Sequence, residues 1–189
     1  MMRDRRRGLT AGERARASEK LCRRITRHPG FIRADRVGIY FPNDGEIDPT
    51  ALAKAGTSRR FFLPVLPPPG ERRLWFSPWA PGRRLIANRY GILEPASRTR
   101  IRAQDLDLLL SPLVAFDRAG GRVGMGGGFY DASLNFLIGK SRGHPVRAYG
   151  VAYSFQQIGL IPRKDWDVPL HGVFTDSTFI SSIITRPVL

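Results

Sequence analysis

The residues with the clearest chemical potential lie between Arg122 and Asp131, where the sequence reads Arg-Val-Gly-Met-Gly-Gly-Gly-Phe-Tyr-Asp. Glycine has no Cβ, so a loop of this kind can turn several amide N–H groups toward one anion. Arg122 adds a cation before the loop, and Asp131 adds a carboxylate of the type that Mg²⁺ prefers. The combination favours binding of a phosphate group.

The loop does not match the known phosphate fingerprints. It lacks the Gly-Lys-Ser/Thr ending of a Walker A loop, and Phe129 stands where the dinucleotide pattern has its third glycine. The alternative interpretation is a flexible surface connection. Flexible linkers are usually rich in serine, whereas this loop is bounded by charges and contains two aromatic rings. We therefore favour a binding loop.

The elements that must position this loop can be predicted from apolar patterning. Residues 106–116 are almost continuously apolar, which predicts a buried strand, and a helical pattern starting near Tyr130 continues over 131–138. A capping-box pattern at Thr10 and an apolar stripe predict a helix over 10–28. The remaining expected elements are strands at 37–41, 59–66, 74–79, 146–154 and 172–180 and a helix at 47–55.

This alternation of helix and strand predicts one α/β domain over residues 1–189. We expect a three-layer α/β/α sandwich with a mainly parallel central sheet and helices on both faces. Glu46 would then lie just past the end of the strand at 37–41, where open α/β sheets place ligands. Its alternative role is to favour the start of the next helix by its charge.

Bulk composition limits the partners and the compartment. The 31 basic and 16 acidic residues give a formal net charge of +15, which indicates anionic partners. The single cysteine, Cys22, excludes an internal disulfide, fits a small core residue and indicates a reducing compartment. We find no apolar stretch long enough for a membrane span and no signal-peptide pattern, so we expect a cytoplasmic protein.

The glycine loop resembles the signature of the 5-formyltetrahydrofolate cyclo-ligase family, also called 5,10-methenyltetrahydrofolate synthetases. Further stretches agree with that family, in its order, over nearly the whole chain; they are 37–42, 45–49, 62–64, 90–95, 105–107 and 167–169. The resemblance implies ATP-dependent conversion of 5-formyltetrahydrofolate to 5,10-methenyltetrahydrofolate, with ATP as co-substrate and Mg²⁺ as cofactor. The absence of a Ser/His/Asp set agrees with chemistry that needs no protein nucleophile.

The resemblance also implies roles for individual residues. The expected catalytic residues are Arg122 and Tyr130, and the expected metal ligands are Asp131 and Asp167. The residues expected to bind ATP are Arg3, Arg122, Val123, Gly124, Met125, Gly126, Gly127, Gly128, Phe129 and Tyr130. Those expected to bind the folate, which carries a glutamate tail, are Phe41, Glu46 and Tyr90, although packing explains Tyr90 nearly as well. We expect a monomer that binds neither membrane nor nucleic acid.

Two regions of the chain depart from the family. Its members usually carry a Lys and an Arg one helical turn apart on the nucleotide, and an alignment through Leu9 and Thr10 puts both before Met1. Either the start of the protein lies further upstream, or Arg3 serves as the nucleotide contact in their place. The alternative interpretation of the basic run over 3–7 is a solvated, frayed terminus. Ala132 stands where many members have Arg.

Two other functions remain open on the sequence alone. One is a basic nucleic-acid-binding module, in which Phe129 or Tyr130 stacks on bases, although no zinc-knuckle or RNA-recognition signature is present. The other is a folate-binding relative that has lost activity together with the amino-terminal phosphate contacts.

Overall fold

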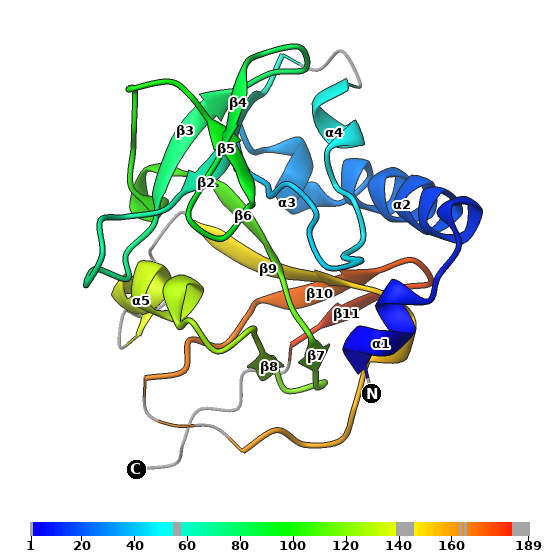
Figure 1. Ribbon diagram of the computed structural model, residues 1–189. Coiled ribbons are helices and arrows are strands. Elements are labelled where there is room, and N and C mark those ends of the chain that lie inside the picture. The colour runs from blue at the N-terminus through cyan, green and yellow to red at the C-terminus, as the bar shows by residue number, and fades with distance from the viewer. Residues whose placement is uncertain (1, 55–57, 139–145, 163, 165, 183–189) are drawn as a thin grey trace.

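The computed structural model describes residues 2–54, 58–138, 146–162, 164 and 166–182. Within these residues a seven-stranded sheet has the order β11-β10-β9-β6-β1-β2-β3 (Figure 1). Its strands are β1 (Arg36–Gly38), β2 (Arg60–Val65), β3 (Trp75–Trp79), β6 (Leu108–Pro112), β9 (Arg147–Ala152), β10 (Gly172–Thr175) and β11 (Phe179–Ser181). The inner pairs are parallel, and only the edge strands β3 and β11 run antiparallel to their neighbours. The predicted mainly parallel sheet is confirmed.

Helices lie on both faces of the sheet. One face carries α2 (Ala11–Thr26), α3 (Pro29–Ile32) and α4 (Ala51–Lys54), and the other carries α5 (Phe129–Leu134) with the 3₁₀ turns η1 (Ala103–Asp105) and η2 (Asn135–Leu137). Side chains alternate accordingly: Leu108 and Leu110 join the α2-side core, and Leu109 joins the α5-side core. The three-layer expectation is confirmed, with a thinner layer on the α5 side.

The amino-terminal half shows how local sequence sets these elements. Thr10 caps α2, because its Oγ1 accepts from the Glu13 amide at 3.2 Å and the Glu13 carboxylate accepts from the Thr10 amide at 2.8 Å. Cys22 lies in the buried stripe of α2, as predicted. The basic run before Thr10 forms a helix, α1 (Met2–Arg7), rather than a frayed end, because Arg6 is buried against the rest of the domain.

Three expected elements differ from the structure. The expected strand over 172–180 is the hairpin β10–β11, because Thr175 Oγ1 accepts from the amides of Ser177 and Thr178 and turns the chain. The apolar run at 106–116 divides into β6 and a short β7 (Ala115–Phe116), which pairs with β8 (Arg122–Val123). The expected helix over 47–55 is the four-residue α4, although residue 55 lies outside the described part.

The topology indicates where a ligand should bind. From β1 the chain continues to β2 on one side, whereas β6, its other neighbour, continues to β9 in the opposite direction. Open α/β sheets bind ligands beyond the carboxyl ends of the strands at such a switch point. The loop after β1 contains Glu46, and the segment after β6 leads through the β7–β8 hairpin into the glycine loop.

Candidate active site

Glu46 is held in a tight turn after β1. Asp44 and Gly45 have φ angles of 51° and 73°, and the Glu46 amide donates to the Asn43 carbonyl at 3.0 Å. The Glu46 carboxylate accepts from the Asn43 amide at 3.1 Å. Burial raises the pKa of Glu46 to about 7, while the Asn43 amide and the charge of Arg6 act against this rise. Glu46 therefore changes its charge near neutral pH.

The β7–β8 hairpin delivers Arg122 through a buried turn. The Asp117 carboxylate accepts from the amides of Ala119 at 2.8 Å, Gly121 at 2.7 Å and Ile161 at 2.9 Å, so it fixes the turn from inside. The anchoring role of Asp117 was not predicted from the sequence. An aspartate two residues before a bonded amide is the usual signal for this geometry, but its bond to Ile161 has no local signal.

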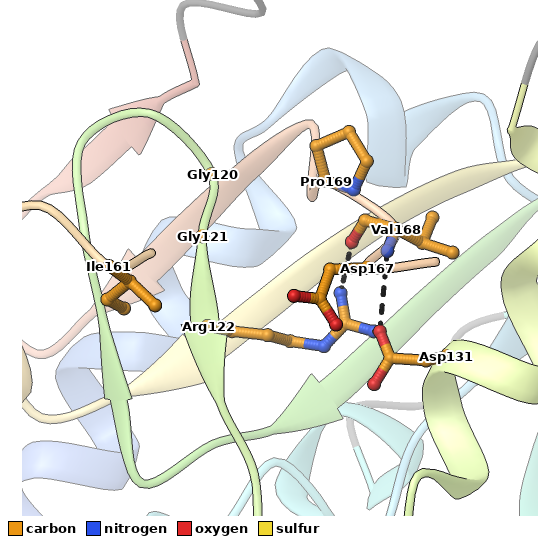
Figure 2. Close-up of a pocket in the computed structure, with 8 residues that line it drawn as sticks. All are labelled: Gly120, Gly121, Arg122, Asp131, Ile161, Asp167, Val168 and Pro169. Atoms are coloured by element: carbon orange, nitrogen blue, oxygen red, sulfur yellow. Dashed lines mark hydrogen bonds and ion pairs between the residues drawn. The ribbon is translucent and has the colours of Figure 1, made fainter. Parts of the chain in front are cut away.

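Arg122 lies in a closed polar cluster with residues from α5 and from the segment before β10. Its guanidinium, 7% exposed, pairs with Asp131 and donates to the Val168 carbonyl, and the Asp131 carboxylate accepts from the Val168 amide at 3.4 Å (Figure 2). Burial lowers the pKa of Arg122, but the charges of Asp131 and Asp167 oppose that effect. The cation is therefore held between two carboxylates.

A small cavity lies within this cluster. It measures about 10 Å³, enough for a single water molecule. Its lining residues are Gly120, Gly121, Arg122, Asp131, Ile161, Asp167, Val168 and Pro169. One cavity is therefore lined by the predicted metal ligands Asp131 and Asp167 and by the predicted catalytic residue Arg122.

Tyr130 lies close enough to Arg122 and Glu46 for the charges of both to act on its phenol. Burial raises the pKa of Tyr130 well above its usual range, the nearby Glu46 carboxylate raises it further, and Arg122 lowers it. The phenol therefore lies within electrostatic reach of both residues and stays protonated at neutral pH. Glu46, Arg122 and Tyr130 come from separate segments, and the structure brings all three together at the switch point.

The glycine loop borders this cluster and faces outward. Gly126 and Gly128 have φ angles of 88° and 64°, in the left-handed region that favours glycine. A Cβ added at Gly124 or Gly126 would meet no described atom within 4 Å, so a ligand can approach the backbone there. Because α5 has six residues, its dipole is small, and anion binding would depend chiefly on loop amides and arginines.

Two residues from other segments lie against this loop. The Tyr90 ring, 60% exposed, meets the Phe129 ring edge-on at 6.4 Å. Arg72 Nη1 would be 3.7 Å from a Cβ placed on Gly128. Arg72 was not predicted as a site residue, because nothing in its spacing shows that a loop more than 50 residues upstream folds over Gly128.

The other predicted site residues take different positions. Phe41 is partly buried and meets the Trp79 ring edge-on at 6.3 Å. Val123 and Met125 are exposed beside the loop, and Gly127 lies beneath the Phe129 ring, 2.7 Å from where a Cβ would stand. Arg3 Nε bonds the Asp44 carboxylate at 2.7 Å, so this candidate nucleotide contact is engaged with the turn before Glu46.

The acidic pair fits Mg²⁺ only together with a phosphate ligand. Within the described part of the chain, no three His, Cys, Asp or Glu residues gather as a metal cluster. Mg²⁺ is commonly bound by one or two protein carboxylates and completes its coordination shell with phosphate oxygens and water. Asp131 and Asp167 match that number of protein ligands. His28 caps α3, and His171 Nδ1 accepts from the Ala148 amide at 3.1 Å, so both take part in structural hydrogen bonds; His144 lies outside the described residues.

Comparison with known sequences gives the family. The 5-formyltetrahydrofolate cyclo-ligase family matches residues 1–176. The chain belongs to this family. It is 35% identical to the 5-formyltetrahydrofolate cyclo-ligase of Escherichia coli over 181 residues, covering 94% of this chain and 97% of the relative. It is 39% identical to that of Haemophilus influenzae over 145 residues, or 75% of each chain.

Solved structures agree with this assignment. The NMR structure of Aquifex aeolicus 5,10-methenyltetrahydrofolate synthetase matches with a TM-score of 0.77 and 30% identity, covering all of this chain and 92% of that one. The Mycoplasma pneumoniae synthetase, at 20% identity and a TM-score of 0.68 over 93% and 94% of the two chains, shares the fold. The family resemblance, the α/β fold and the ligase class predicted from the sequence are confirmed. No helix in the described residues is long and apolar enough to cross a membrane.

Proposed function

We propose that the protein converts 5-formyltetrahydrofolate and ATP into 5,10-methenyltetrahydrofolate, ADP and phosphate. The observation that supports this most directly is the meeting of Glu46, Arg122 and Tyr130 at the switch point, beside an open glycine loop. A reaction between two bound substrates needs both sites at one edge of the sheet, and the grouping of these residues supports such an arrangement.

The formyl group is amide-like, so its oxygen is a poor leaving group and N10 cannot displace it unaided. The formyl oxygen attacks the γ-phosphorus, a P–O bond forms, and the bond to the ADP oxygen breaks. N10 then attacks the formyl carbon and loses its proton, and the C–O bond breaks to release phosphate. Such steps need alignment and charge stabilisation rather than a protein nucleophile.

The phosphate side of the site consists of Arg122 and the amides of Gly124 to Gly128. Arg122 supports this role because it is a buried cation whose charge is retained by two carboxylates. Asp131 and Asp167 would hold Mg²⁺ together with the nucleotide phosphates. When bound, the ion neutralises phosphate charge that would otherwise repel the attacking oxygen.

The folate side consists of Glu46, Tyr130, Phe41 and Tyr90. The Glu46 carboxylate accepts N–H groups of the pterin ring, and the exposed Tyr90 ring offers a face for the pterin or aminobenzoate. Tyr130 stays protonated and so orients the formyl group without placing a second anion beside the phosphates.

The basic surface near Tyr90 suits an acidic glutamate tail. Arg72 lies over the end of the glycine loop, and the Arg89 guanidinium is 5.3 Å from the Tyr90 ring centre. Arg102 is less suited, because it stacks on Trp75 at 3.2 Å. The single cysteine favours a reducing compartment, so we assign the enzyme to the cytoplasm, and we expect it to act as a monomer.

One assay distinguishes the candidate functions. The protein is mixed with ATP, Mg²⁺ and 5-formyltetrahydrofolate, and absorbance of the methenyl product is followed. Product that forms only with ATP supports the ligase. Folate binding without turnover would show an inactive relative, and salt-sensitive RNA binding without turnover would show a nucleic-acid module.

A further inference from the structure

Arg6 is a fully buried cation in the amino-terminal helix. Its side chain spans two strand ends: Nη2 bonds the Asp44 carboxylate at 2.8 Å in the loop after β1, and Nη1 donates to the Leu113 carbonyl at 3.1 Å just after β6. Gly45 packs on the same helix, since a Cβ there would stand 2.9 Å from the Arg6 carbonyl. Arg6 therefore joins α1 to both strand ends of the switch point.

The three arginines around Asp44 differ in exposure. Arg3 Nε lies 2.7 Å and Arg7 Nη1 lies 3.5 Å from this carboxylate, and both side chains are about half exposed. Arg6 alone of the three is buried, and its Nε has no hydrogen-bond partner among the described residues. Of the three, Arg6 is the arginine whose charge acts on Glu46, and burial leaves that charge poorly screened by solvent.

The charge of Arg6 acts on Glu46 by lowering the pKa of its carboxyl. The groups that face Glu46 are Arg6 from α1, Asn43 and Asp44 from its own loop, Tyr40 after β1, and Tyr130 from α5. Among these side chains Arg6 supplies the positive charge, whereas Asp44 opposes ionisation of Glu46. The Arg6–Asp44 bond also sets the turn that places Glu46 at the sheet edge.

We propose that Arg6 is a positioning residue that favours the ionised form of Glu46 and holds it in place for the folate at neutral pH. The proposal rests on the proposed function for the role of Glu46. Arg6 contacts no substrate in this role and acts on the site through Glu46. Removing the charge of Arg6 should favour the protonated Glu46, which can no longer accept two N–H groups from a pterin.

The test uses Arg6→Gln, which keeps donors for Leu113 but loses the charge, and Arg6→Lys, which keeps the charge. Activity is measured as kcat/KM for 5-formyltetrahydrofolate from pH 6 to pH 9 at saturating ATP. A rise of about one unit in the pKa of Glu46 lowers its ionised fraction at pH 7 about fivefold. Arg6→Gln should show that loss at pH 7 and recover by pH 9, with the KM for ATP unchanged.

Three further variants distinguish this electrostatic role of Arg6 from a general loss of stability. Arg6→Lys should keep the pH profile of the unmodified protein, and Arg7→Gln, an exposed partner of the same carboxylate, should do the same. In a Glu46→Gln background, Arg6→Gln should no longer change the profile. An unchanged profile in Arg6→Gln, or an equal shift in Arg6→Lys, would overturn the proposal.

A second measurement covers the case in which the protein does not turn over. Titration of the Glu46 side-chain carboxyl by ¹³C NMR reports its pKa without any substrate. Asp44→Asn removes the opposing charge and should lower this pKa, whereas Arg6→Gln should raise it. If the carboxyl responds in this way without turnover, the electrostatic role stands and the proposed function fails; a carboxyl that ignores both changes defeats the positioning role.

Discussion

Replacing Glu46 with glutamine should stabilise the protein at pH 8 and leave its stability below pH 4.5 unchanged. Burial raises the pKa of Glu46 from 4.5 to about 7 in the folded protein. Between these values the folded state keeps a proton that the unfolded state releases, so the free energy of unfolding falls as pH rises. The loss reaches about 3 kcal/mol above pH 7, and glutamine, which does not titrate, removes it.

The assay is urea unfolding at several pH values between 4.5 and 8 for the unmodified protein and Glu46→Gln. Glutamine can still accept the hydrogen bond from the Asn43 amide, so the two proteins should converge at the acidic end and separate steadily toward pH 8. Glu71→Gln, which alters an exposed carboxylate, is the matched control. Parallel curves for Glu46→Gln and the unmodified protein would refute the link between burial and ionisation of this residue.

Further predictions concern the phosphate side, the core and the surface charge. Arg122→Ala should lower kcat/KM about a hundredfold, or about 3 kcal/mol of transition-state stabilisation, and unchanged turnover would defeat that role. Gly126→Ala should raise the KM for ATP through strain at its φ of 88°, whereas Gly124→Ala, which lacks a positive φ, should matter less. Burial raises the pKa of Cys22 to about 12, so thiol reagents should label the folded protein slowly and the unfolded protein quickly. The kcat/KM values should fall as salt is added, and a flat response would exclude electrostatic steering of the substrates.

The elements that local patterns specify were predicted well. The capping box at Thr10 and the apolar stripe behind it define α2, and an apolar run defines β6, because both signals depend on residues close in sequence. The hairpin at β10–β11 was predicted as one strand, although the polar residues 175–178 separate its two apolar segments. Its turn depends on the Thr175 hydroxyl, which hydropathy does not register.

The site residues likewise fall into those that local motifs mark and those that depend on contacts between distant parts of the chain. Arg122, Tyr130 and Glu46 were predicted as site residues because the family motifs mark them, and the structure places them at one edge of the sheet. Arg6 and Arg72 were not, because their roles depend on contacts with Asp44 and Gly128 across long stretches of sequence. A buried arginine within a basic run is indistinguishable in sequence from its solvated neighbours, so only the packing of α1 reveals it.

The unequal layers of the fold explain where the substrates can approach. The α2 side is covered by a 16-residue helix, whereas the α5 side is covered by a six-residue helix, 3₁₀ turns and loops. A long helix after β8 would cover the backbone of the glycine loop, but the short α5 leaves Gly124 and Gly126 open and Tyr90 exposed beside Phe129. In the proposed reaction ATP binds at the glycine loop, and the thin layer is the side of the sheet on which that loop is open to a ligand. Extending α5 by a turn into the loop should therefore weaken ATP binding even if every charged residue is kept.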